Sequence, residues 1–234
     1  MRKTLLALTA ATATLMAGTA LAADTVKIGL IMAYSGPFAD TANQMQRGID
    51  LYIAQHGDEV AGKKIELIKK DTGGPNPDVA KRLAQELVVR DGVDILAGFT
   101  LTPEALGAAD VADQAKKMLV VMNAATSVIT EKSPFVVRTS LTIPQLNYPF
   151  GKWAYDKAGI KSVYTLVADY GPGHDAEKAF AKGFEEAGGK IVGADQRLGR
   201  TRQGGQQRLR RKARLHRRGV VVLHRLRRRH RFGA

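Results

Sequence analysis

Three segments of the chain carry hydroxyl or aromatic side chains that could bind a small molecule. The first is "AGFTLTPEAL", in which Thr102, Pro103 and Glu104 directly follow an apolar run. This order predicts a helix with Thr102 as its N-cap, Pro103 at the first helical position and Glu104 complementing the helix dipole. A helix N-terminus also attracts carboxylates, so Thr102 has two interpretations, as a cap alone or as a ligand contact.

Two further loops follow apolar runs in the same way. The segment "MNAATSVIT" brings Ala124 and Thr126 after a run of five apolar residues. Its small side chains would leave room for a ligand beside the backbone, although a plain turn would have the same composition. The segment "ADYGPGHD" places Tyr170 before a Gly-Pro-Gly sequence. It lacks the G-x-x-x-x-G-K pattern of a phosphate-binding loop, and we predict a turn there.

Catalytic residue types are scarce before residue 196. The chain has no Cys, and His56 and His174 are the histidines of this part, which leaves few candidates for a metal cluster or a Cys–His pair. Asp169 and His174 are close in sequence, but His174 and Asp175 more simply open a helix. No G-x-S-x-G elbow is present. We therefore predict a binding protein rather than an enzyme, with no metal or cofactor; an α/β enzyme is the less favoured alternative.

The elements that must position these loops alternate between strand and helix. Apolar periodicity predicts strands at 25–33, 63–70, 93–98, 118–122 and 135–140, with helices at 42–56, 76–92 and 102–117. The pattern then restarts with a helix at 142–159, a strand at 160–170, a helix at 174–189 and a strand at 190–195. This order predicts an α/β fold of two similar units, each with a parallel sheet covered by helices. Ligands of such sheets bind beyond the carboxyl ends of the strands.

The first 22 residues have the pattern of an export signal. Arg2 and Lys3 precede a short apolar run, and the small residues of Ala20–Ala22 form a cleavage pattern. The apolar run is shorter than the ~20 residues that a membrane span requires. We expect a signal peptide over 1–22 and a periplasmic mature chain that begins at Ala23.

The positive charge of the chain is concentrated at its C-terminal end. The formal net charge is +14, yet all 22 Asp and Glu residues lie within 24–195, and Arg recurs throughout 197–231. A GC-rich gene read out of frame would give this composition. We expect 196–234 to be a disordered or out-of-frame tail and this copy to be truncated and non-functional. The alternative is a secreted binder of polyanions or nucleic acids that acts through the basic tail.

Several blocks of the sequence resemble the Leu/Ile/Val-binding type of periplasmic solute-binding proteins, which serve ABC importers. They include "VKIGLIMAYSGPFAD", "GVDILAGFTLTPEALGAADVAD", "VVMNAATSVIT", "SPFVVRTS" and "LVADYGPGHDAEKAFAKGFEEAGGKIVGAD". The resemblance covers about residues 24–195. It implies the type I periplasmic-binding-protein fold, in which two doubly wound parallel-sheet lobes close on a ligand. The first lobe would span 23–140, and 141–195 would form an incomplete second lobe.

The resemblance also implies which residues bind. Thr102 matches a Ser or Thr that binds the ligand carboxylate, and Ala124 and Thr126 match a carbonyl and a hydroxyl that meet its amino and carboxylate groups. Tyr170 matches an aromatic residue of the second lobe that covers the ligand. Thr41 replaces a frequent aromatic, which affects the expected side-chain selectivity. The implied protein is a monomer that delivers an amino acid, or an aromatic or other small carboxylate, to a permease in the inner membrane. No nucleic-acid partner is expected.

Overall fold

The structure is a computed structural model that describes residues 25–197 and 219–222. Its first lobe contains a six-stranded sheet with the strand order β2-β3-β1-β4-β5-β6. Every neighbouring pair in this sheet is parallel except β2 and β3. The elements of the lobe are β1 (Thr25–Met32), η1 (Gly36–Phe38), α1 (Ala39–His56), β2 (Glu59–Val60), β3 (Lys63–Asp71), α2 (Pro77–Gln85), η2 (Glu86–Arg90), β4 (Ile95–Gly98), α3 (Thr102–Ala115), β5 (Met118–Val121), η3 (Ser127–Glu131) and β6 (Val136–Arg138).

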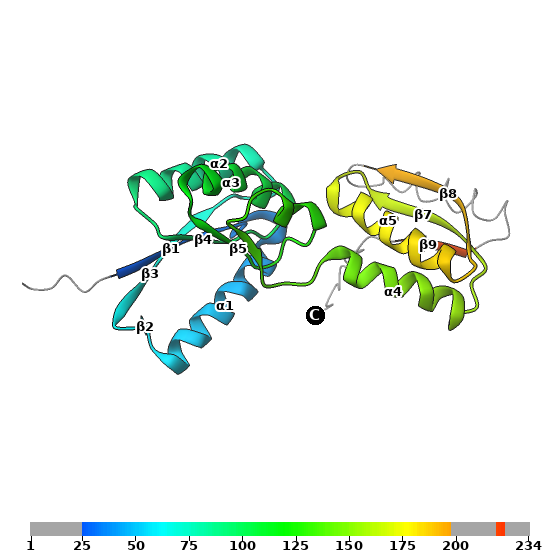
Figure 1. Cartoon of the computed structure of the whole chain (residues 1–234), viewed down its shortest axis with the longest axis horizontal. Coiled ribbons are helices and arrows are strands. Elements are labelled where there is room, and N and C mark those ends of the chain that lie inside the picture. The colour runs from blue at the N-terminus through cyan, green and yellow to red at the C-terminus, as the bar shows by residue number, and fades with distance from the viewer. Residues whose placement is uncertain (1–24, 198–218, 223–234) are drawn as a thin grey trace, which may run out of the picture.

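Helices cover both faces of the first sheet, as the sequence predicts (Figure 1). Side chains of a strand alternate between faces, so neighbouring residues of β1 join different cores. Leu30 and Met32 pack in one buried cluster with residues of α1, whereas Ile31 packs in another with α2 and α3. This arrangement confirms the doubly wound α/β architecture, and it places the loops after β1, β4 and β5 at one edge of the sheet.

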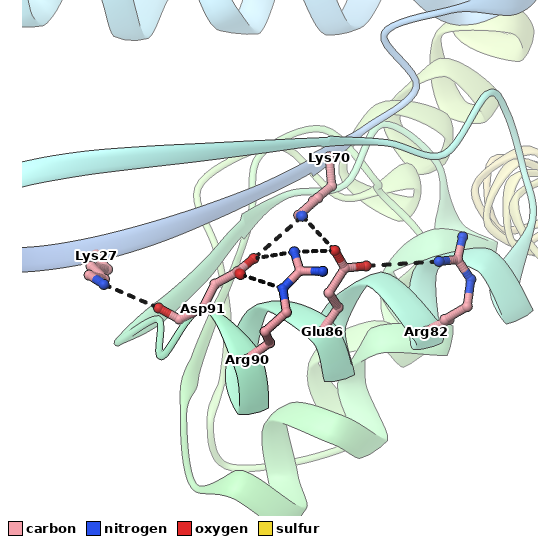
Figure 2. A network of polar contacts seen from close by, with 6 residues as sticks. All are labelled: Lys27, Lys70, Arg82, Glu86, Arg90 and Asp91. Carbon is pink, nitrogen blue, oxygen red and sulfur yellow. Dashed lines mark hydrogen bonds and ion pairs between the residues drawn. The ribbon is translucent and has the colours of Figure 1, made fainter.

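Charged side chains fasten the end of the second helix to the sheet (Figure 2). The helix continues from α2 into the π-helical turn η2, an irregularity that periodicity did not predict. Lys70 of β3 forms ion pairs with Glu86 at 2.8 Å and with Asp91 at 3.4 Å, and Arg90 pairs with both carboxylates. The bond from Lys70 lowers the pKa of Glu86 below its ordinary value. The network therefore joins η2 and Asp91 to β3.

The second lobe is a smaller α/β unit that lies beside the first (Figure 1). Its parallel strands have the order β8-β7-β9. The elements are α4 (Ile143–Asp156), β7 (Ser162–Ala168), α5 (Gly171–Glu186), β8 (Lys190–Arg197) and β9 (Gly219–Val222). The helices α4 and α5 cross closely because Gly183 has no side chain: a β-carbon there would overlap the carbonyl oxygen of Tyr148. Phe180 and Phe184 stack beneath this crossing in a fully buried core.

The basic C-terminal segment contains one strand that the sequence did not predict. Residues Gly219–Val222 form β9, which pairs in parallel with β7. β8 also extends two residues past the expected boundary at 195. The rest of the tail and the expected signal peptide over 1–22 lie outside the described residues. In the part of the chain that the structure describes, no helix combines the length and apolar character of a membrane span.

Candidate functional site

Thr102 and Thr126 meet in the first lobe. Thr102 begins α3 and Thr126 directly precedes η3, and their hydroxyl oxygens lie 2.7 Å apart in a hydrogen bond. Both residues are only 4% exposed. A hydroxyl has one hydrogen to donate, so the pair has two donors and uses one of them internally. The other hydroxyl hydrogen can be donated to an acceptor that approaches the pair.

The prediction that Thr102 is the N-cap of α3 is wrong by one residue. Leu101 holds the N-cap position with an extended backbone, and Pro103 lies in the first turn as the second helical residue. The shift arises because the Glu104 carboxylate accepts a hydrogen bond from the Leu101 backbone N–H at 3.0 Å. The helix terminus is thereby stabilised without the Thr102 hydroxyl, which is available for Thr126.

Glu104 is a fully buried carboxyl group beneath this helix terminus. Its side chain is 0% exposed and accepts a second hydrogen bond, from the Thr72 hydroxyl, at 2.8 Å. Burial raises the pKa of Glu104 above its ordinary value, and the bonds from Thr72 and Leu101 oppose that shift only in part. The sequence suggested that Glu104 complements the helix dipole but did not indicate its burial, and the structure places it inside the lobe.

Backbone and side-chain hydrogen bonds fix the loops that surround the hydroxyl pair. The Thr100 hydroxyl accepts from the Ala33 backbone N–H at 2.9 Å, and the Thr100 carbonyl accepts from the Asn123 side chain at 2.7 Å. Ala124 is 3% exposed and donates its backbone N–H to the Phe99 carbonyl. Phe99 is fully buried with a φ of 65°, a left-handed conformation that a non-glycine residue adopts only under local constraint. These bonds join the loops after β1, β4 and β5.

Arg138 holds the loop around Thr126 from the side of β6. Its guanidinium donates to the Ala125 carbonyl at 3.1 Å and to the Thr126 carbonyl at 2.6 Å. Burial lowers the pKa of Arg138, while the nearby Asp175 of the second lobe acts in the opposite direction. Arg138 was not among the predicted site residues. A charged residue at the end of the short apolar strand "VVR" was the signal that could have suggested it.

The second lobe reaches the hydroxyl pair through the start of α5. The predicted turn at Gly-Pro-Gly is instead the first turn of this helix, with Tyr170 at its N-cap position. A β-carbon at Gly171 would lie 3.8 Å from the methyl carbon of Thr126 and 4.0 Å from that of Thr102. Tyr170 is therefore one residue from the contact between the lobes; it is 36% exposed, and partial burial raises the pKa of its phenol.

Other residues singled out in the sequence take no part in this cluster. His174 pairs with Asp169 at 3.2 Å on the surface of the second lobe, and His56 stacks on Tyr52 at the end of α1. Thr41 lies partly buried in the first turn of α1. Across residues 25–197 and 219–222, no group of acidic or histidine side chains has the arrangement of a metal site.

The cluster has the chemistry of a site for a small anion. A hydroxyl pair lies at the N-terminus of α3, where the helix dipole contributes partial positive charge. The carboxyl groups next to the pair are already hydrogen-bonded, since Glu104 accepts from Thr72 and Leu101 and Asp175 accepts from Ser127. The hydroxyl pair thus offers one unshared hydroxyl hydrogen at a helix N-terminus, an arrangement that suits a carboxylate oxygen.

The chain is similar to periplasmic solute-binding proteins, both by family profile and by sequence identity. A sequence profile of a family described as periplasmic binding protein matches residues 25–201. The chain is 47% identical over 189 residues to a "Leu/Ile/Val-binding protein homolog 6" of Brucella abortus, an alignment that covers 81% of this chain and 48% of that protein. The chain thus spans about half the length of the curated relatives it matches.

Solved structures of similar sequence share the fold. A solute-binding protein of an ABC transporter from Rhodopseudomonas palustris BisB5, in complex with 3,4-dihydroxybenzoic acid, is 46% identical with a TM-score of 0.77 and is matched over 85% of this chain and 55% of its own. A second R. palustris solute-binding protein, in complex with 4-hydroxybenzoate, is 44% identical with a TM-score of 0.76; the match covers 81% of this chain and 51% of that one.

Proposed function

The chain belongs to the periplasmic binding protein family, and on this basis we propose that it is a periplasmic solute-binding component of an ABC importer. Its ligand in this proposal is a small carboxylate, which it would pass to a permease in the inner membrane. Aromatic acids of the benzoate type are the ligand class that we favour, with a branched-chain amino acid as the alternative.

The observation that carries the proposal is the hydrogen-bonded pair of Thr102 and Thr126 at the start of α3. The free hydroxyl hydrogen of this pair would donate to a ligand carboxylate, and the helix dipole would add a favourable electrostatic contribution. Both hydroxyls are buried, which strengthens such a bond relative to one in water. Tyr170 and Gly171, from the second lobe, would cover the ligand.

The choice between benzoates and amino acids depends on the ammonium group. An amino acid needs acceptors for its ammonium as well as donors for its carboxylate. The carboxylates of Glu104 and Asp175 are already engaged within the protein, which favours a ligand without a positive charge. The hydroxybenzoates bound by the two R. palustris relatives support the same choice.

Calorimetric titration of the purified chain with 4-hydroxybenzoate, 3,4-dihydroxybenzoate and leucine tests the proposal. We expect the benzoates to bind more tightly than leucine. Thr102→Val keeps the shape of the side chain and removes its hydroxyl, so benzoate binding should weaken by about 1.5–3 kcal/mol. Thr130→Val, which removes an exposed hydroxyl of η3, is the matched control. Preference for leucine or equal effects of the two variants would contradict the proposal. Absence of binding to all three ligands would also contradict it for this chain, and is the result expected if this copy is truncated and non-functional.

Export is a separate part of the proposal. The pattern at Ala20–Ala22 predicts cleavage after Ala22. N-terminal sequencing of the mature protein from a periplasmic fraction should begin at Ala23, and a mature chain that retains Met1 would be evidence against export.

A further inference from the structure

One side-chain contact connects the two lobes directly. Asp175, the fifth residue of α5, accepts hydrogen bonds from the Ser127 backbone N–H at 2.9 Å and from the Ser127 hydroxyl at 3.0 Å. Ser127 belongs to the first lobe and is the first residue of η3, directly after Thr126. Both residues are partly buried, so water competes only in part for these bonds. We refer to this contact of Ser127 and Asp175 as the interlobe latch.

The charges around the interlobe latch are complementary. Arg138 of the first lobe lies close enough to Asp175 for the carboxylate to act on the pKa of its guanidinium. The same guanidinium holds the carbonyl groups of Ala125 and Thr126. The negative charge of Asp175, from the second lobe, therefore lies near the positive charge of Arg138, which is hydrogen-bonded to the Ala125–Thr126 loop of the first lobe. A carboxylate that accepts two hydrogen bonds in such a place binds more strongly than a neutral acceptor would.

We infer that Asp175 is a positioning residue that holds the two lobes closed through Ser127 before any ligand arrives. The contact joins segments on opposite sides of the interlobe connection at residues 139–142, so opening about that connection must break both hydrogen bonds. Because Ser127 adjoins Thr126, the same contact also fixes the loop of the hydroxyl pair. This inference concerns the lobes without ligand and does not depend on which carboxylate the protein binds.

A latched closed state has a consequence for binding. A fraction of molecules that is already closed lowers the free energy that the ligand must supply to close the lobes, and affinity rises in proportion to the competent fraction. Loss of the interlobe latch should therefore change the population of closed molecules in the absence of ligand. Substitutions that remove a ligand contact would leave that population unchanged.

Distance measurement between two spin labels tests the inference on the ligand-free chain. The chain has no Cys, so Val89→Cys and Lys157→Cys introduce unique labelling sites, one on each lobe. Val89 is 84% exposed and Lys157 is exposed at the end of α4, so neither label should disturb a core. Pulsed electron-spin resonance then gives the distribution of distances between the lobes.

Asp175→Ala removes both latch bonds and should lower the ratio of closed to open molecules roughly tenfold, which corresponds to about 1.4 kcal/mol. Asp169→Ala is the matched control, because Asp169 lies just before the same helix but pairs with His174 of its own lobe. The control should leave the distance distribution unchanged. An unchanged distribution in Asp175→Ala, or equal changes in the two variants, would overturn the inference.

A double-mutant cycle separates the interlobe latch from a local effect on α5. Ser127→Ala removes one of the two bonds and should give a smaller shift than Asp175→Ala. If Asp175 acts through Ser127, the double variant should resemble Asp175→Ala alone. Additive shifts would mean that Asp175 acts within the second lobe, and the inference would then be wrong.

Discussion

The hydroxyl oxygens of Thr102 and Thr126 lie 2.7 Å apart although the two residues are 24 positions apart in the sequence. The parallel pairing of β4 with β5 produces this proximity, because it brings the carboxyl ends of both strands to the same edge of the sheet. Each hydroxyl is buried, so each depends on the other for a hydrogen bond in the folded chain. The pair is therefore a structural bond as well as a candidate ligand contact.

Thr102→Val should destabilise the first lobe. The substitution leaves the buried Thr126 hydroxyl without its partner, which typically costs about 1–3 kcal/mol. Urea unfolding followed by circular dichroism measures this loss in free energy of unfolding. The double variant Thr102→Val with Thr126→Val removes both hydroxyls and should recover much of the stability, since no unpaired polar group remains. A double variant that is less stable than the single one would show that the bond itself is not the cause.

The position of the candidate site could be predicted from the sequence. Apolar runs before Thr102 and Ala124 indicated two buried strands of one parallel sheet, and parallel strands carry their sites at the carboxyl edge. The fold class followed from the same alternation of strands and helices. For Thr102 and Thr126 the resemblance to solute-binding proteins and the strand pattern pointed to the same edge, where the structure joins them.

Contacts that depend on the register of distant elements were not predictable in this way. The hydrogen bonds of Asp175 to Ser127 cross between lobes, and no local pattern encodes the angle at which the lobes meet. Glu104 was expected only to complement the helix dipole, because acidic residues are common in the first turn of a helix. Its burial was not predictable, since its hydrogen-bond partner Thr72 lies 32 positions earlier in the chain. Tertiary packing determines both the Asp175–Ser127 contact and the burial of Glu104.

Glu104→Gln should change how stability depends on pH. Burial raises the folded-state pKa of Glu104, so the folded chain binds this proton more tightly than the unfolded chain does. Its contribution to stability is therefore greatest at low pH and declines as the pH rises from the ordinary carboxyl value towards the raised one. Gln has no proton to lose in this range and should remove the decline. Thermal unfolding of both proteins across this pH range measures the effect; parallel curves would contradict the prediction.

Lys70→Met should weaken the network that fastens η2 to β3 (Figure 2). The bond from Lys70 lowers the folded-state pKa of Glu86, so this contribution is present above the ordinary carboxyl pKa and is lost as the pH falls through the lowered value. The variant should lose stability at neutral pH but little in acid. Lys64→Met is the matched control, because the Lys64–Asp58 pair is longer, at 3.7 Å, and more exposed. Equal losses for the two variants at neutral pH would exclude a specific role of the network.

Gly173→Ala should destabilise the second lobe, whereas Gly171→Ala should not. A β-carbon at position 173 would overlap the carbonyl oxygen of Ala168, so the first turn of α5 would have to move away from the end of β7. Overpacking of this kind typically costs about 1–3 kcal/mol. At position 171 the added methyl would make only ordinary contacts, 3.8 Å and 4.0 Å from the methyl carbons of Thr126 and Thr102.

The melting temperatures of the two glycine variants can be compared directly, because positions 171 and 173 lie in the same helical turn. Alanine lowers backbone entropy in the unfolded chain at both positions, so that effect cancels in the comparison. The remaining difference reports how closely α5 approaches β7, and this approach determines where Tyr170 and Asp175 face the first lobe. A lower melting temperature for Gly173→Ala alone supports this packing. If Gly171→Ala is the more damaging variant, the first turn of α5 does not lie against Ala168 as described.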